Sequence, residues 1–235
     1  YPGDPRDGKA LVSAKKRGRL SLGGAGHGDA LDHVLAPESR AEGMVWSEAA
    51  NGFVRMKPAV WLEGLGVEYT QYANVDNLLT PFADAFFLGE HILSRDPLVE
   101  SEGRAHISIG MIKKTAWDAR RGYYRDGLGN VVIVDGRKES VDYPDSSDAM
   151  LALPYGNPSI VIVTNDSLRG SIPITYSIAE KTEAASDGHE IPIYKFERMA
   201  PNKKRYGCEY AYTGEDVFAA IKNPDKPGAP DSPAT

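Results

Sequence analysis

The chain has 235 residues, of which 41% are hydrophobic and 26% charged, and its formal net charge is -6. This length and composition are enough to bury a core, so wholesale disorder is excluded, and the acidic balance argues against a surface built entirely to hold nucleic acid. The one cysteine, Cys208, excludes an intrachain disulfide and a multi-cysteine zinc site, and no apolar run reaches the roughly 18 to 20 residues that a membrane span needs.

The two ends of the chain differ in composition from its middle. Residues 1–28 are rich in glycine and carry four cations close together, Lys15, Lys16, Arg17 and Arg19, which predicts a flexible basic N-terminal arm. Residues 223–235 are rich in proline, which predicts an extended C-terminal tail. Between them, residues 29–222 are predicted to form a single β-rich domain.

The arm ends in a stretch with the composition of a functional loop, LSLGGAGHGDALDH, at residues 20–33. Its glycines do not have the spacing of a dinucleotide-binding loop, and no βαβ pattern follows, so a phosphate loop is not favoured. His27, Asp29 and His33 are of the residue types that bind metals and are the weak metal candidates of the chain. The favoured interpretation is simpler: Asp29 caps a short helix at the end of the arm.

Most of the middle of the chain has the composition of β-strands. Residues 52–62, 66–72 and 189–199 are rich in β-branched and aromatic residues, and residues 106–114 alternate apolar and small polar residues as a half-buried strand does. Residues 121–143 predict a meander of two hairpins, and residues 159–181 predict another hairpin. Pro173 and Pro192 are expected at edges or bulges, since proline cannot donate to a strand ladder.

Two helices are predicted among these strands. Thr80 is a candidate N-cap with Pro81 at the first helical position, and Thr213 with Asp216 resembles a capping box. Because strands outnumber helices and come as hairpins, the expected class is mainly β: an antiparallel sandwich or barrel, jelly-roll-like, with one or two inserted helices and extended arms.

Two segments combine cations with aromatic rings, the composition of a groove for single-stranded nucleic acid. They lie at residues 113–125 and 203–212. With the cations of the arm, they supply the candidates for nucleic-acid or assembly contact: Arg120, Arg121, Tyr123, Tyr124, Lys203, Lys204 and Arg205. On strands, half of these residues would instead point into the core.

A β-rich body with compositionally unusual arms and no catalytic motif predicts a non-enzymatic, self-assembling structural protein, such as a viral coat or shell subunit. Its expected partner is itself, with nucleic acid as a second partner through the basic arm. No cofactor is expected, and the expected location is a virion or the cytoplasm, with export not excluded.

Two alternatives stay open. One is a nucleic-acid-binding module that uses the basic aromatic segments. The other is a β-barrel or jelly-roll enzyme that depends on a metal, for which His106 and His189 are the one pair of histidines on neighbouring predicted strands.

Overall fold

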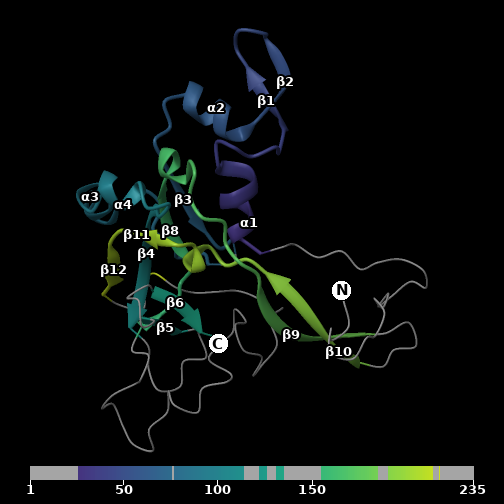
Figure 1. Ribbon diagram of the computed structural model, residues 1–235, viewed down its shortest axis with the longest axis vertical. Helices are drawn as coiled ribbons and strands as arrows, with labels where there is room; N and C mark the ends of the chain where they lie inside the picture. The colour runs from purple at the N-terminus through teal and green to yellow at the C-terminus, as the bar shows by residue number, and fades with distance from the viewer. Residues whose placement is uncertain are drawn as a thin grey trace, which may run out of the picture.

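The computed structural model describes residues 26–75, 77–113, 122–125, 131–134, 155–184, 190–213 and 217. The predicted arm lies almost wholly outside these residues, as does the predicted tail. The chain folds as mixed α/β with antiparallel sheets, and the described strands form no closed barrel (Figure 1). The predicted antiparallel strands with inserted helices are confirmed, whereas the predicted barrel is wrong and the class is mixed α/β rather than mainly β.

The described elements follow one another in this order: α1 (Gly28–Ala30), η1 (Leu31–Leu35, a π-helical turn), β1 (Gly43–Ser47), β2 (Gly52–Met56), α2 (Pro58–Gly64), β3 (Tyr69–Ala73), α3 (Ala85–Leu93), α4 (Pro97–Glu100), β4 (Ala105–Lys113), β5 (Gly122–Arg125), β6 (Val131–Val134), β7 (Tyr155–Gly156), β8 (Ile160–Thr164), η4 (Asn165–Leu168), β9 (Ser177–Ala184), β10 (Glu190–Glu197), η5 (Ala200–Asn202), β11 (Arg205–Tyr206) and β12 (Glu209–Tyr212).

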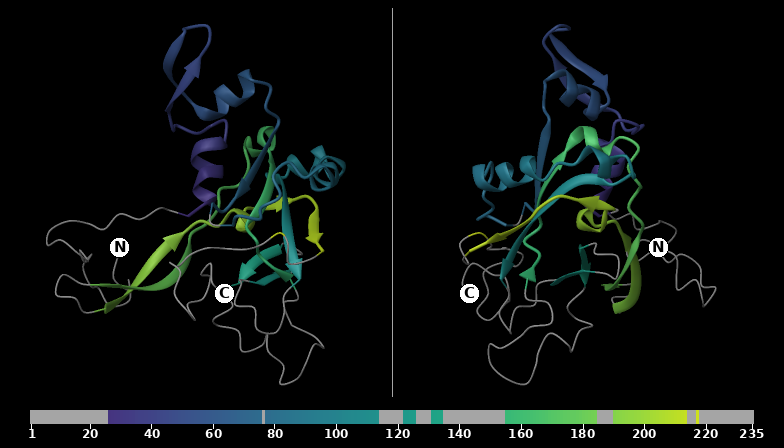
Figure 2. Two further views of the ribbon diagram at one scale, coloured as in Figure 1. Left: turned by 180° about the vertical axis from the view of Figure 1, so that it is seen from behind. Right: turned by 60° about the vertical axis from the view of Figure 1, so that its left-hand side comes forward.

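The main sheet has the strand order β3-β8-β4-β7-β5-β6, with antiparallel neighbours along this path. β11 and β12 pair with β4 in parallel. Two antiparallel pairs stand apart, β1 with β2 and β9 with β10. The β1-β2 hairpin projects from one end of the molecule, and the β9-β10 ribbon extends away from the sheet (Figures 1 and 2).

The core lies on both faces of the central strands β4 and β8. One face carries Ile107, Ile109 and Val163 and packs on Leu31 from η1. The other carries Ile112, Ile160 and Ile162 and packs on Phe87 from α3. The views in Figure 2 show the segments α1 and α3 on opposite sides of this sheet. Helices therefore cover both faces, as in α/β proteins.

β4 differs from its prediction because its second face is also covered. Every residue from Ala105 to Ile112 is buried. At Gly110, a Cβ atom would lie only 2.8 Å from the Tyr212 ring and 3.2 Å from Cβ of Ile160, so this position is filled by its neighbours. The small residues that suggested a solvent face are small because other side chains pack over them.

Some of the other predicted strands and hairpins are confirmed and others are wrong. The first hairpin of the predicted meander, β5 with β6, and the strand β10 are confirmed, while the second hairpin lies outside the described residues. Residues 58–64 form the helix α2 rather than a strand, since Pro58 suits a first helical turn. The hairpin predicted at 159–181 is wrong, because β8 pairs with β3 and β4 while β9 pairs with β10.

The two prolines that were expected at strand edges or bulges lie in different kinds of structure. Pro173 lies outside any strand. Pro192 lies in a two-stranded ribbon, in which each strand has a free edge that tolerates a missing N–H donor. None of the helices in the described ranges is long and apolar enough to cross a membrane.

Candidate functional site

The glycine-rich turn before α1 is pressed against the chain at Arg198 and Met199. Gly26 has a φ of +92°, and a Cβ there would lie 2.3 Å from the Arg198 carbonyl oxygen. Gly28 donates its N–H to the same oxygen at 2.9 Å, and its Cβ would meet the backbone carbons of Arg198 and Met199 at 3.0 Å. Only glycine permits so close an approach of two backbones at these positions.

This turn lies beside the carboxyl-terminal half of β3. The ring of His27 is 5.2 Å from the ring of Tyr72, and its Nδ1 accepts a hydrogen bond from the Ala200 N–H at 3.0 Å. The turn, the end of β3 and the start of η5 therefore meet at one end of the sheet. Because glycine lets a backbone or a ligand approach the chain closely, we take this junction as the candidate site.

Charged side chains hold the helical segment that directly follows the turn. Asp32 in η1 accepts from Lys203 Nζ at 2.5 Å and from the Ile174 N–H at 2.7 Å. The side chains of Asp32 and Lys203 are only 5% and 2% exposed, so this ion pair is buried. It joins the first helix, the segment before β9 and the segment before β11 into one support.

Arg198 is the second cation of this support. Its Nη1 lies 3.3 Å from Asp29 Oδ1 and also contacts His33 Nε2. Its guanidinium stands 4.5 Å from the centre of the Tyr176 ring, and its Nε is buried without a hydrogen-bond partner among the described residues. Arg198 thus holds several segments together while keeping one donor uncommitted.

The metal candidates lie close together but are used otherwise. His27 Nδ1 accepts from the backbone, and Asp29 pairs with Arg198 and lies 3.4 Å from His33 Nε2. Within the described part of the chain, no group of three or more His, Cys, Asp or Glu side chains is arranged to hold a metal ion. α1 begins at Gly28, so Asp29 lies in its first turn and is not the N-cap.

The basic candidates fall into two groups. Lys15, Lys16, Arg17, Arg19, Arg120 and Arg121 lie outside the described residues, and for Tyr123 and Tyr124 only the strand β5 is described. Among the others, Lys203 and Arg205 are buried, while Lys204 is exposed. Arg205 donates to the Ile107 carbonyl at 3.2 Å. Lys203 and Arg205 therefore serve contacts within the chain.

Sequence analysis missed Arg198 because its segment was interpreted only as a strand. The available signal was Asp29 and Asp32, three residues apart on one helical face. Two carboxylates in that position need cations from elsewhere in the fold once they are buried.

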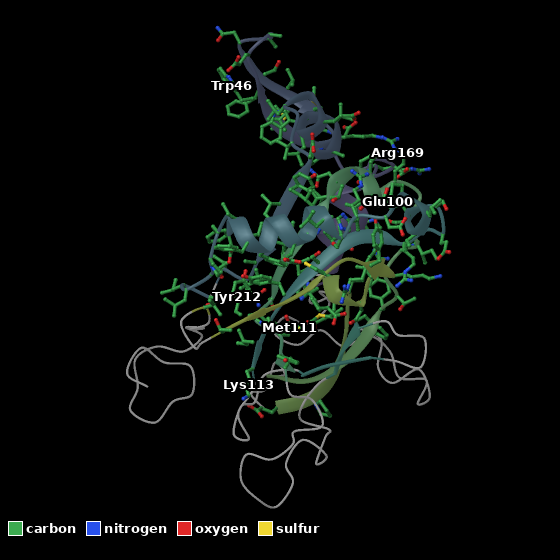
Figure 3. The ribbon with its side chains drawn as sticks, turned by 90° about the vertical axis from the view of Figure 1, so that its left-hand side faces the viewer. Trp46, Glu100, Met111, Lys113, Arg169 and Tyr212 are labelled. Carbon is green, nitrogen blue, oxygen red and sulfur yellow. The ribbon has the colours of Figure 1, made fainter. Side chains whose placement is uncertain are left out.

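A cavity of about 490 Å³ lies at the other end of this strand pair, where β3 begins and β8 ends. Its lining includes Leu62, Glu68, Asn165 and Arg169, the last labelled in Figure 3. The Asn165 side chain accepts from Thr70 and donates to the Val67 carbonyl. We place the candidate site at the Gly26–Gly28 junction rather than here, because two glycines approach another backbone closely there.

Comparison with known proteins extends the fold assignment. No protein-family model matches the chain, and no curated protein matches it. Among solved structures, the uridine diphosphate N-acetylglucosamine pyrophosphorylase of Trypanosoma brucei, in complex with an inhibitor, is similar with a TM-score of 0.70 and 22% identity, over 98% of this chain and 44% of that chain.

Two further structures are similar. A putative UDP-N-acetylglucosamine pyrophosphorylase of Entamoeba histolytica has a TM-score of 0.58 and 17% identity, over 93% of this chain and 50% of that chain. A UDP-glucose pyrophosphorylase variant of Leishmania major has a TM-score of 0.50 and 14% identity, over 85% of this chain and 40% of that chain. The chain spans half or less of the length of these structures, and its fold resembles that part of the UDP-sugar pyrophosphorylase fold.

This likeness corrects the function predicted from the sequence. The prediction of a coat or shell subunit assumed a jelly roll with assembly arms, whereas the fold resembles part of the UDP-sugar pyrophosphorylase fold. That prediction is wrong, and so is the inclination away from an enzyme. The jelly-roll enzyme also assumed a fold that the chain does not have. Of its two histidines, His106 stacks on His91, and His189 lies outside the described residues.

Proposed function

We propose that this chain forms part of a nucleotidyltransferase that makes or cleaves UDP-sugars. The observation that carries the proposal is the likeness of almost the whole chain to a UDP-N-acetylglucosamine pyrophosphorylase, with a TM-score of 0.70. In such a reaction an oxygen of a sugar 1-phosphate attacks the α-phosphorus of UTP, and pyrophosphate leaves. Because a fold can host several functions, the site must support the proposal independently.

The junction at Gly26–Gly28 supports it by its geometry. The end of β3 meets a glycine turn there. Gly26 is half-buried and has backbone rather than a side chain at its exposed part, which lets a planar base or a phosphate approach closely. Gly28 is buried and packs on Arg198 and Met199, so it fixes the position of this turn.

Arg198, Asp32 and Lys203 have a positioning role in this proposal. They hold the turn against η5 and the segment before β9. Catalytic and binding groups lose effectiveness when they are misplaced by as little as about 1 Å, so a rigid support behind a turn contributes to ligand affinity. We expect its loss to weaken ligand binding without removing any atom that touches the ligand.

The test is a calorimetric titration of the chain with UDP-N-acetylglucosamine, UDP-glucose and GDP-mannose. The proposal expects both uridine nucleotides to bind, and GDP-mannose to bind at least about tenfold more weakly, a difference of 1.4 kcal/mol. Equal binding of all three would contradict recognition of uridine, and no binding of any would contradict the proposal as a whole.

A matched pair of variants locates the site. R198Q removes the cation that holds the turn, whereas R169Q removes an exposed cation that lines the cavity. We expect R198Q to weaken UDP-N-acetylglucosamine binding about tenfold or more, because the turn loses its fixed position, and R169Q to leave binding unchanged. The reverse order would place the ligand in the cavity instead.

A further inference from the structure

Two fully buried histidines stack on one another beneath α3. His91 comes from α3 and His106 from β4, and neither has exposed surface. Their ring centres lie 3.9 Å apart, and their planes are inclined by only 10°. The ring of Tyr206 stacks on the far side of His106 at 4.8 Å, and the ring of Tyr69 meets His91 edge-on at 5.7 Å. The pair therefore joins a helix to three strands.

Every ring nitrogen of the pair has a hydroxyl partner. His91 Nδ1 lies 2.7 Å from Ser108 Oγ, and its Nε2 lies 2.9 Å from Thr164 Oγ1. His106 Nδ1 lies 2.8 Å from the same Thr164 oxygen, and its Nε2 lies 3.0 Å from Ser94 Oγ. Thr164 is thus the bridge between the two rings.

The donor and the acceptor of each hydrogen bond can be assigned one after another, beginning at Ser94. Ser94 Oγ donates its single hydrogen to the His91 carbonyl at 2.8 Å, so it can only accept from His106 Nε2. A neutral His106 then has a bare Nδ1, which must accept from the Thr164 hydroxyl. Because the hydrogen of Thr164 is now used, His91 Nε2 must donate to Thr164.

The other end of the chain agrees with this assignment. His91, with its hydrogen on Nε2, has a bare Nδ1 that accepts from the Ser108 hydroxyl. Ser108 Oγ in turn accepts from the Cys208 N–H at 3.0 Å, as an oxygen whose own hydrogen points elsewhere can do. One arrangement of hydrogens thus satisfies all five side chains, with both rings neutral and both hydrogens on Nε2.

Few charges face the pair from the elements around it. Arg95, after α3, and Glu100, in α4, form an ion pair at 3.0 Å, and Tyr206 donates to Glu100 at 2.7 Å. Burial lowers the pKa of His91 to about 3, with further lowering from His106 and Arg95. Burial also lowers the pKa of His106 to about 4, although Glu100 opposes this shift. Tyr69 meets His91 edge-on, and Cys208 lies next to the pair through its backbone N–H, which donates to Ser108.

We infer that His91, His106, Ser94, Ser108 and Thr164 form a pH-dependent latch, which holds α3 on β4 and β8 only while both imidazoles are neutral. A proton added to Nδ1 of either ring would meet a hydroxyl that already points its hydrogen at that nitrogen. The hydroxyl would have to turn away, and a buried positive charge would gain no acidic partner in contact with it. The latch therefore opens rather than titrates in place.

The sign of the pH effect follows from linkage. Both pKa values are lower in the folded state than the ordinary value of 6.5, so the stabilisation is complete above pH 6.5 and is lost as the pH falls toward 4 and 3. Opening takes up one proton for each ring. The equilibrium constant for opening should therefore rise by up to about 100-fold per pH unit well below pH 6.5.

Nitrogen NMR of the ¹⁵N-histidine-labelled chain tests the latch directly. We expect His91 and His106 to show hydrogen on Nε2 and a bare Nδ1, and to stay neutral from pH 8 to 5 while α3 remains docked. A hydrogen on Nδ1 of either buried ring, or titration near pH 6.5 with α3 still in place, would overturn the inference.

Hydrogen exchange of the α3 amides supplies the second measurement. We expect opening of α3 to increase as the pH falls from 7 to 5, and S108A to increase it at least about tenfold at pH 7, because His91 Nδ1 loses its donor. S101A is the matched control, since the Ser101 hydroxyl donates to the Leu98 carbonyl in an exposed contact. Equal exchange in the two variants would show that the hydroxyl network does not hold the helix.

Discussion

Close packing by its neighbours, and not its backbone angles, requires glycine at position 28. A Cβ at this position would lie 2.7 Å from Ile174 Cδ1 and 3.0 Å from two backbone carbons. The methyl group of Ile174 can move, but the backbone cannot do so without shifting the turn. Gly89 in α3 is the opposite case, since nothing lies within 4 Å of the position its Cβ would take.

The first prediction compares these two glycines. G28A should lower the free energy of unfolding by about 1 to 3 kcal/mol, because the added methyl group overpacks the junction. G89A should raise it by about 0.5 to 1 kcal/mol, because alanine loses less conformational freedom in a helix. Urea unfolding of both variants measures the difference. If G28A were as stable as G89A, the close approach at the junction would be wrong.

The start of α3 is determined by the side chain that caps it. α3 begins at Ala85, where the Asp84 side chain accepts from the Phe86 and Phe87 N–H groups at 2.9 and 3.2 Å. The predicted cap, Thr80, instead donates its hydroxyl to the Asn77 carbonyl. The helix therefore starts later than its proline suggested, because an aspartate accepts from the first free N–H groups better than threonine does.

The second prediction tests this cap. D84A should lower the free energy of unfolding by about 0.5 to 2 kcal/mol, the usual effect of removing an N-cap acceptor. D84N should stay close to the parent chain, because the amide oxygen still accepts from the same N–H groups. Thermal unfolding followed by circular dichroism compares the two. An asparagine variant as unstable as the alanine variant would mean that Asp84 acts by its charge and not as a cap.

The β1-β2 hairpin carries two exposed aromatic side chains. In the β1-β2 hairpin, Trp46 faces Phe53 across the two strands, and their rings meet edge-on at 5.5 Å. Both side chains are exposed, Trp46 by 49% and Phe53 by 67%. Trp46 lies far from the sheet at the projecting end of the molecule (Figure 3). The cross-strand pair therefore stabilises the hairpin itself.

At the scale of the whole molecule, a buried ion pair ties together segments that are far apart in the sequence. Lys203 meets Asp32 across 171 positions of the chain, and the Ile174 N–H meets the same carboxylate. The two side chains are only 5% and 2% exposed, so burial separates both charges from solvent. The pair thus makes the position of the glycine turn depend on the segments around β9 and β11.

The third prediction follows from this burial. D32A should lower the free energy of unfolding by about 3 to 5 kcal/mol, because it leaves Lys203 buried without its anion. Replacing both residues, as D32L with K203M, should recover much of this loss. E42A is the control, since Glu42 meets Arg55 in an exposed pair worth about 0 to 1 kcal/mol. If D32A cost no more stability than E42A, the buried pair would not support the junction.

Part of this fold was readable from the sequence. The strand β10 and the hairpin of β5 with β6 were predicted correctly, because β-branched and aromatic runs bounded by turn residues are local signals. The glycine-rich stretch was also singled out. Its partner Arg198 was not, because nothing local to residues 26–33 says which distant segment will pack against them.

The sequence by itself determined that the chain can bury a core, where several strands and turns lie, and that the stretch at residues 20–33 is unusual. Only the tertiary structure decided that β8 pairs with β3 and β4, that both faces of β4 are covered, and that Lys203 is buried on Asp32. The reason is physical. Backbone preference and hydrophobic period act over a few residues, whereas burial and ion pairing depend on which distant segments meet.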